Sequence, residues 1–264
     1  MLAMILPTYR SGSPDGGRAV WADLRVCLHA VEAYAVDLVD EVVVAWDGPF
    51  APDGMPEHPK IRYLHRPPRL DHGDALIWTI EQTEADELIQ TGDDVVLHPD
   101  TIPFLLEDVA LLERERTDLR IGTVGARSNF IHGPQNVRWP NGGQLHPLDM
   151  AYSSESKIIQ TDKIITVLCW YRRAAWEEVG RFPKGLLQFG DILYSYDLRK
   201  AGYSLFVSRA YVHHVGGSHG IRAFGGDEQS WYHDAVQWTK ANRPDFLPWL
   251  VENGYVPQAL ADAP

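Results

Sequence analysis

The sequence predicts an α/β fold in which a mostly parallel sheet is sandwiched between helices. Two observations lead to this prediction. Short apolar runs rich in Val, Ile and Leu alternate with longer stretches of helical periodicity, which is the pattern of βαβ units. The chain is also long enough, at 264 residues with 45% hydrophobic side chains, to bury a sizeable core.

The expected elements begin with a βαβαβ order. Strands are predicted at 2–6, 41–46, 61–64 and 87–90, and helices at 19–36 and 74–84. A helix at 101–116, capped by Asp100 or Thr101, and a strand at 121–126 come next. Between 127 and 160 the periodicity fades, which is typical of a binding loop. Strands at 163–171 and 204–207 and helices at 173–180, 190–201 and 227–241 complete the pattern.

Charge is distributed unevenly along the chain. The net charge is −12, yet residues 1–100 carry 7 basic and 18 acidic side chains while residues 120–222 carry 13 and 7. The overall charge disfavours non-specific nucleic-acid binding, although the basic segment permits a phosphate-bearing ligand.

The sequence also indicates the cellular compartment of the protein. No apolar run reaches the roughly 18 residues of a membrane span, and the apolar start runs into Pro7 without a basic lead-in. Cys27 and Cys169 lie far apart in apolar surroundings, which favours buried thiols in a reducing compartment. We therefore expect a cytoplasmic protein with no membrane span.

Polar side chains lie directly after the predicted strands, where ligands bind in open parallel sheets. These strand-end residues are Pro7, Thr8, Tyr9, Arg10, Asp47, Asp93 and Asp94. Two adjacent carboxylates at the end of a buried strand are costly unless a cation or donors neutralise them. A hard divalent ion, Mg²⁺ or Mn²⁺, is the expected partner. A turn with a helix cap is the alternative.

The order of several motifs resembles one enzyme class. ELIQTGDDVVLHPD at 87–100 resembles the strand and DXD motif of nucleotide-sugar glycosyltransferases with the GT-A fold. MILPTYR at 4–10, the strand at 42–48 and GDA at 73–75 are similar to their opening elements. The runs at 171–182, 189–191 and 198–203 resemble the acceptor side of family 2 enzymes. The resemblance covers about residues 1–220, with Gly92 and Gly190 where the family often carries acids.

This resemblance implies a metal-dependent, inverting transfer of a sugar from a UDP- or GDP-sugar to a hydroxyl acceptor. The residues expected to bind the donor are Pro7, Thr8, Tyr9, Arg10, Asp47, Asp74, Asp93, His219 and Arg222. The expected metal ligands are Asp94 and either His213 or His214, with His213 slightly favoured.

Asp191 is the expected general base. It occupies the position of the acid in the family's ED motif, and a carboxylate there can take the proton of the acceptor hydroxyl. The alternative is an N-cap for the next helix. Asn129, Gln135 and Trp139 are expected to bind the acceptor, because amides and aromatic rings suit hydroxyls and sugar faces.

These assignments divide a single integrated domain into three parts. Residues 1–126 form the donor-binding half, and residues 127–226 form the acceptor-binding and catalytic half. The Gly-rich stretch at 215–226 is expected to close as a lid that carries His219 and Arg222. Residues 227–264 form a helical tail.

Three other functions fit parts of the pattern. A phage-type enzyme that glycosylates hydroxymethylated DNA bases fits the basic segment and the loop with Asn and Trp residues. A nucleotidyltransferase can use a similar sheet, but the glycines before Arg18 only loosely imitate the phosphate loop expected after its first strand. A nucleotide-sugar-binding protein without turnover fits Gly92 and Gly190. A retaining enzyme shares the same strand-end motifs.

Overall fold

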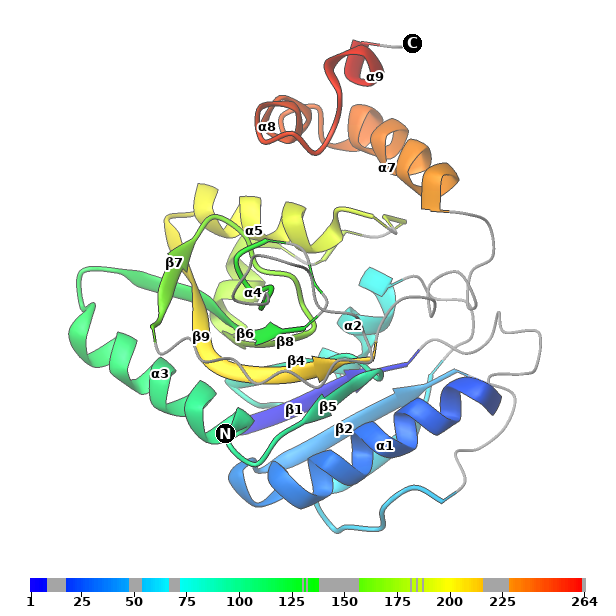
Figure 1. Ribbon diagram of the computed structural model, residues 1–264, viewed down its shortest axis with the longest axis vertical. Helices are drawn as coiled ribbons and strands as arrows, with labels where there is room; N and C mark the ends of the chain where they lie inside the picture. Colours follow the sequence, from blue (N-terminus) through cyan, green and yellow to red (C-terminus); the bar gives the residue numbers. More distant parts are fainter. Residues whose placement is uncertain are drawn as a thin grey trace.

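The computed structural model has the α/β architecture expected from the sequence. It describes residues 1–8, 18–47, 54–66, 72–129, 131, 133–137, 157–180, 182–183, 185–186, 188–215 and 228–262. Nine strands of these residues form one sheet in the order β3-β2-β1-β4-β8-β6-β9-β5, with β7 beside β9. Helices lie on both faces of the sheet (Figure 1).

Each predicted element has a counterpart in the structure, and most have shifted ends. The strands are β1 (Leu2–Pro7), β2 (Glu41–Trp46), β3 (Ile61–His65), β4 (Glu87–Thr91), β5 (Val95–Leu97), β6 (Arg120–Ser128), β7 (Ile159–Thr161), β8 (Leu168–Arg172) and β9 (Tyr203–His214). The helices are α1 (Arg18–Tyr34), η1 (Val36–Leu38), α2 (His72–Ile80), α3 (Thr101–Glu115), α4 (Arg173–Val179), α5 (Gly190–Lys200), α7 (Glu228–Asn242), α8 (Leu247–Glu252) and α9 (Gln258–Asp262). β5, β7 and η1 were not expected from the sequence, whereas α8 and α9 lie within the helical tail predicted at 227–264.

The first four strands of the sheet order are all parallel. β1 pairs with β2 and β4, and β2 pairs with β3. Val42, Val43 and Val44 are fully buried, as expected where helices cover both faces of a parallel sheet. Because the strands run in the same direction, the carboxyl ends of β1, β2 and β4 lie at one edge of the sheet.

The other half of the sheet mixes directions. β8 lies antiparallel between β4 and β6, while β9 runs parallel to β6 and antiparallel to β5 and β7. The strand predicted at 163–171 begins only at Leu168. The main chain of Ile164 and Ile165 instead forms hydrogen bonds with the side chains of Ser195 and Gln135, so it is satisfied without a strand ladder.

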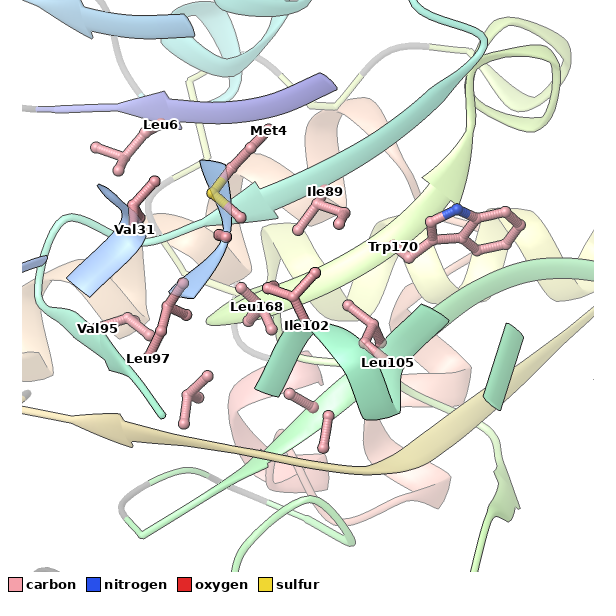
Figure 2. Close-up of a cluster of buried hydrophobic side chains, with 14 of the residues drawn as sticks. Met4, Leu6, Val31, Ile89, Val95, Leu97, Ile102, Leu105, Leu168 and Trp170 are labelled. Carbon is pink, nitrogen blue, oxygen red and sulfur yellow. The ribbon is translucent and has the colours of Figure 1, made fainter. Parts of the chain in front are cut away.

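Two apolar clusters flank the sheet. One packs against α1 and α3, and the other packs against α2, α4 and α5. Figure 2 shows part of the first, in which Val95 and Leu97 of β5 lie near Val31 of α1. Full burial of a valine or leucine stabilises a fold by about 1.5–3 kcal/mol. The burial of Val95 therefore anchors the turn that precedes it, which contains Asp93 and Asp94.

A third apolar cluster joins α5 to the C-terminal helices α7, α8 and α9. In Figure 1 these helices lie beyond α5 on the side away from the sheet. Arg243 forms a bidentate ion pair with Asp197 of α5, with distances of 2.6 and 2.7 Å. Both cysteines are buried, and neither is in a disulfide. Of the helices that the structure describes, none combines the length and apolar character needed to cross a bilayer.

β9 runs without a break from Tyr203 to His214, and α3 holds its middle. Asp108 of α3 is fully buried. Its carboxylate accepts hydrogen bonds from the Ser208 hydroxyl, at 2.7 Å, and from the Arg209 main-chain N–H and Nε, at 2.7 and 2.6 Å. These bonds fix the middle of β9, so the strand extends to His213 and His214.

We expect Asp108→Ala to lower the free energy of unfolding by about 3 kcal/mol, because it leaves the donors of β9 unpaired. Denaturant unfolding measures this change. The control is Asp118→Ala, which removes an exposed carboxylate that pairs with Arg116 and should cost less than about 1 kcal/mol. Equal losses in the two variants would contradict the anchoring role of Asp108.

Candidate active site

A cavity of about 220 Å³ lies at the carboxyl ends of β1 and β4. The end of β4 and the turn after it, the segment before β8 and the first turn of α5 form its walls. The lining residues are Pro7, Gln90, Thr91, Gly92, Asp93, Asp94, Ile165, Thr166, Val167 and Asp191. The structure thus brings four predicted site residues, Pro7, Asp93, Asp94 and Asp191, to one cavity.

Gly92 shapes the turn after β4. Its N–H donates to the Val167 carbonyl at 2.9 Å. A Cβ on residue 92 would lie 2.9 Å from Asp94 Oδ1 and 3.2 Å from Val95 Cγ2. A larger residue would therefore displace the Asp94 carboxylate. This close approach is a physical reason for glycine at the position where the DXD motif often carries an acid.

The pairing of β5 with β9 brings Asp94 to His214. Val95 is the partner of His214 in this antiparallel ladder, and the Asp94 carbonyl accepts the Val215 N–H at 2.9 Å. Asp94 Oδ2 lies 3.2 Å from His214 Nε2. Their side chains are 13% and 19% exposed, so both remain accessible to a ligand.

The geometry favours His214 over His213 as the metal ligand, whereas the sequence slightly favoured His213. Successive residues of a strand point to opposite faces, and His214 is the histidine beside Asp94. His213 is the partner of Val96 and is only 6% exposed. His214 is therefore the better candidate metal ligand.

The Asp94 and His214 pair fits a hexacoordinate divalent ion. Two neighbouring ligands at about 2.1 Å from such an ion lie about 3 Å apart, close to the observed 3.2 Å. Within the described part of the chain, no group of three or more His, Cys, Asp or Glu side chains is arranged to hold a metal. These two side chains would hold Mn²⁺ or Mg²⁺ together with substrate phosphate oxygens and water, as is usual for such ions.

Asn129 and Gln135, both predicted to bind the acceptor, are buried and bonded to main chain. Asn129 accepts the His214 N–H at 2.7 Å and donates to the His214 carbonyl at 3.2 Å. Gln135 donates to the carbonyls of Ala126 and Ile165 and accepts the Ile165 N–H. Both amides therefore stabilise main chain around the site. Asn129 holds the end of β9 at His214, and Gln135 holds the cavity wall at Ile165.

Asp191 lies inside the first turn of α5. The helix begins at Gly190 and its N-cap is Phe189, so the alternative that Asp191 is the N-cap is wrong. Thr166 Oγ1 donates to Asp191 Oδ1 at 2.5 Å. This bond orients the carboxylate at the cavity wall.

Phe189 is the one described non-glycine residue with a positive φ, at 65°. This conformation costs a non-glycine residue about 1–3 kcal/mol. The Phe189 ring packs edge-on against Tyr232 of α7, with ring centroids 5.5 Å apart. The strained backbone directly precedes the helix turn that carries Asp191, and strain of this kind gathers at functional sites.

Cys169 is not the reactive group of this cavity. Burial raises the pKa of its thiol well above the ordinary value, and the nearby Asp191 carboxylate raises it further. A thiol that stays protonated is a poor nucleophile.

A buried ion pair joins the ends of the first three strands. Arg66 Nη2 lies 3.3 Å from Asp47 Oδ2 and donates to the Thr8 carbonyl at 2.5 Å. The Arg66 and Asp47 side chains are 0% and 2% exposed, so the guanidinium offsets the cost of burying the carboxylate. Two predicted donor-binding residues, Thr8 and Asp47, are held together in this way.

The remaining predicted residues divide into two groups. Asp74 lies in the first turn of α2 and is half-buried. Tyr9, Arg10, Trp139, His219 and Arg222, and the Gly-rich stretch except its first residue, Val215, lie outside the described residues.

Sequence reasoning missed three residues of the site. Arg66 comes directly after β3, so the strand-end rule applied to that strand would have found it. Gln90 was visible as a polar residue in an apolar strand. The sequence did not mark Thr166 as a site residue, because its segment was assigned to a strand.

Solved glycosyltransferases share this fold. The mannosyltransferase PcManGT from Pyrobaculum calidifontis, in complex with GDP-Man and Mn²⁺, matches 96% of this chain and 69% of its own at a TM-score of 0.58 and 18% identity. GalNAc-T7 with UDP, GalNAc and Mn²⁺ matches 97% of this chain and 51% of its own, at a TM-score of 0.63 and 14% identity. S. aureus TarS matches 98% of this chain and 82% of its own, at a TM-score of 0.50 and 12% identity.

No protein-family profile and no curated protein matches the sequence. At identities below 20%, the structural likeness establishes the fold. The chain therefore has the GT-A-type fold that its motifs predicted.

We expect Gly92→Ala to weaken Mn²⁺ binding in the presence of UDP or GDP about tenfold, or about 1.4 kcal/mol, because the new Cβ displaces the Asp94 carboxylate. Isothermal titration calorimetry measures the affinity. Gly190→Ala is the matched control, since the one described atom that a Cβ there would meet is Pro183 Cγ, at 3.9 Å. Unchanged affinity in Gly92→Ala would contradict the role assigned to the turn.

Proposed function

We propose that this chain is a metal-dependent, inverting glycosyltransferase that moves a sugar from a UDP- or GDP-sugar to a hydroxyl acceptor. One observation carries the proposal. Asp94, which lies 3.2 Å from His214, and Asp191, which Thr166 orients, line the same cavity. A candidate site for a metal-bound diphosphate and a candidate base thus flank one space. The GDP-Man, UDP and Mn²⁺ bound in two structural neighbours support this assignment.

Asp94 and His214 would bind the diphosphate of the donor through the metal ion that they hold. Bound Mn²⁺ or Mg²⁺ supplies Lewis-acid stabilisation of the departing diphosphate. Asn129 keeps the main chain of His214 in place, and Gly92 leaves room for the Asp94 carboxylate. Thr8 and Asp47, at the ends of β1 and β2, would bind the nucleoside. Their contacts with Arg66 support this by holding the two strand ends together.

Asp191 acts on the acceptor. The acceptor oxygen forms a bond to the anomeric carbon while the bond from that carbon to the diphosphate oxygen breaks, and Asp191 takes the hydroxyl proton. Thr166 occupies Oδ1, which leaves Oδ2 to receive the proton. General-base catalysis of this kind contributes about 10²–10⁴-fold. A single displacement inverts the configuration at the anomeric carbon.

We expect the chain to hydrolyse a UDP- or GDP-sugar with Mn²⁺, water replacing the acceptor, and EDTA to abolish this turnover. Asp191→Asn should lower kcat at least about 100-fold, because the amide cannot take the proton, with little change in donor KM. A coupled assay for released nucleoside diphosphate measures both.

Asp234→Asn, an exposed position on α7, is the matched control and should leave kcat unchanged. Donor binding without hydrolysis would support a binding protein and contradict the transferase proposal. Near-normal turnover in Asp191→Asn would exclude Asp191 as the base.

A further inference from the structure

Gln90 is a buried polar residue that the mechanism above does not use. It lies on β4 between Ile5 of β1 and Cys169 of β8 and is 2% exposed. It lines the cavity that Asp94 and Asp191 also line. Its Oε1 is buried and has no hydrogen-bond partner within the described part of the chain.

Gln135 shows how a buried glutamine is normally accommodated in this protein. It is 1% exposed, and its amide forms three hydrogen bonds with main-chain groups of Ala126 and Ile165. Burying an amide without such partners costs free energy. Gln90 therefore does not contribute to stability as Gln135 does, and an apolar side chain would suit its surroundings in the sheet better.

We propose that Gln90 recognises the transferred sugar by hydrogen bonding one of its hydroxyl groups. This inference rests on the proposed glycosyltransferase function. A carboxamide offers both an acceptor and a donor, and a sugar hydroxyl offers both in return. The bound sugar would then offer Gln90 Oε1 the hydrogen-bond partner that it lacks within the described part of the chain.

The cavity has the right size and walls for one sugar ring. Its volume of about 220 Å³ is below the roughly 300–1,000 Å³ of pockets that enclose whole drug-sized ligands. The turn with Asp93 and Asp94 forms one wall, and Thr166 and Asp191 contribute to another. A glycosyl group must lie between its diphosphate and the base that activates its acceptor, and Gln90 lines that space.

This arrangement makes Gln90 a determinant of sugar specificity. A site that hydrogen bonds a substrate hydroxyl rejects an analogue that lacks it, because the buried partner is then left unpaired. The discrimination falls on the single hydroxyl that faces the amide. Nucleoside and diphosphate recognition, at other residues, should be unaffected.

The experiment uses the UDP- or GDP-sugar that the unmodified chain hydrolyses with Mn²⁺, together with its monodeoxy analogues. The variant is Gln90→Met, which removes the amide at similar length. We expect one deoxy analogue to be hydrolysed by the unmodified chain with kcat/KM at least about tenfold lower than the parent sugar. In Gln90→Met the parent should fall to a similar extent, and the parent and that analogue should become equivalent.

Stability provides the second readout. Gln90→Met should melt at the same temperature as the unmodified chain or higher, because it removes a buried amide oxygen that has no hydrogen-bond partner among the described residues. Gln135→Met is the matched control and should melt lower, because it removes three hydrogen bonds.

The possible outcomes separate the two proposals. Equal hydrolysis of all monodeoxy analogues by the unmodified chain, or full activity of Gln90→Met, overturns the role of Gln90 and leaves the transferase function standing. Loss of melting temperature in Gln90→Met with equal loss on every donor assigns Gln90 to the fold and also overturns its role. Hydrolysis of no donor by the unmodified chain contradicts the proposed function and this inference with it.

Discussion

The antiparallel pairing of β5 with β9 determines where the two candidate metal ligands meet. β5 has three residues, and its register sets Val95 beside His214 and Val96 beside His213. Moving this register by one residue would turn the other histidine toward Asp94. A strand this short does not set its own register, so the surrounding structure must do so.

Buried interactions on both sides supply that constraint. Val95 and Leu97 pack in the apolar cluster beneath α1, and the carbonyl of Asp94 receives the Val215 N–H. Asp108 fixes the middle of β9, and Asn129 fixes its end. Much of the packing around β9 therefore serves to keep a carboxylate and an imidazole 3.2 Å apart. Phe189, by contrast, has a positive φ, and Gln90 buries an amide oxygen that has no hydrogen-bond partner among the described residues. Departures of this kind from local rules are characteristic of functional sites.

Local sequence pattern was sufficient to predict the parallel half of the sheet. Continuous apolar runs indicated β1, β2 and β4, and the strand-end rule then placed Asp47 and Asp94 at one edge. The assignment of Asp191 came from resemblance, and the structure places this residue at the cavity.

The features that sequence pattern did not predict depend on contacts between distant segments. β5 is too short to show periodicity, and the choice between His213 and His214 needs its register against β9. The segment around Thr166 was taken for a strand because its apolar residues resemble one, whereas Ser195 and Gln135 hold its main chain.

Binding of Mn²⁺ to the chain in the presence of UDP or GDP tests the central claim most directly, when His214→Gln is compared with His213→Gln. Calorimetry gives the affinity, and circular dichroism confirms that both variants fold. We expect His214→Gln to lose at least about tenfold in Mn²⁺ affinity, because one of two protein ligands is removed, while His213→Gln binds like the unmodified chain. Retention of binding in His214→Gln with loss in His213→Gln would contradict the assignment of His214 as the metal ligand.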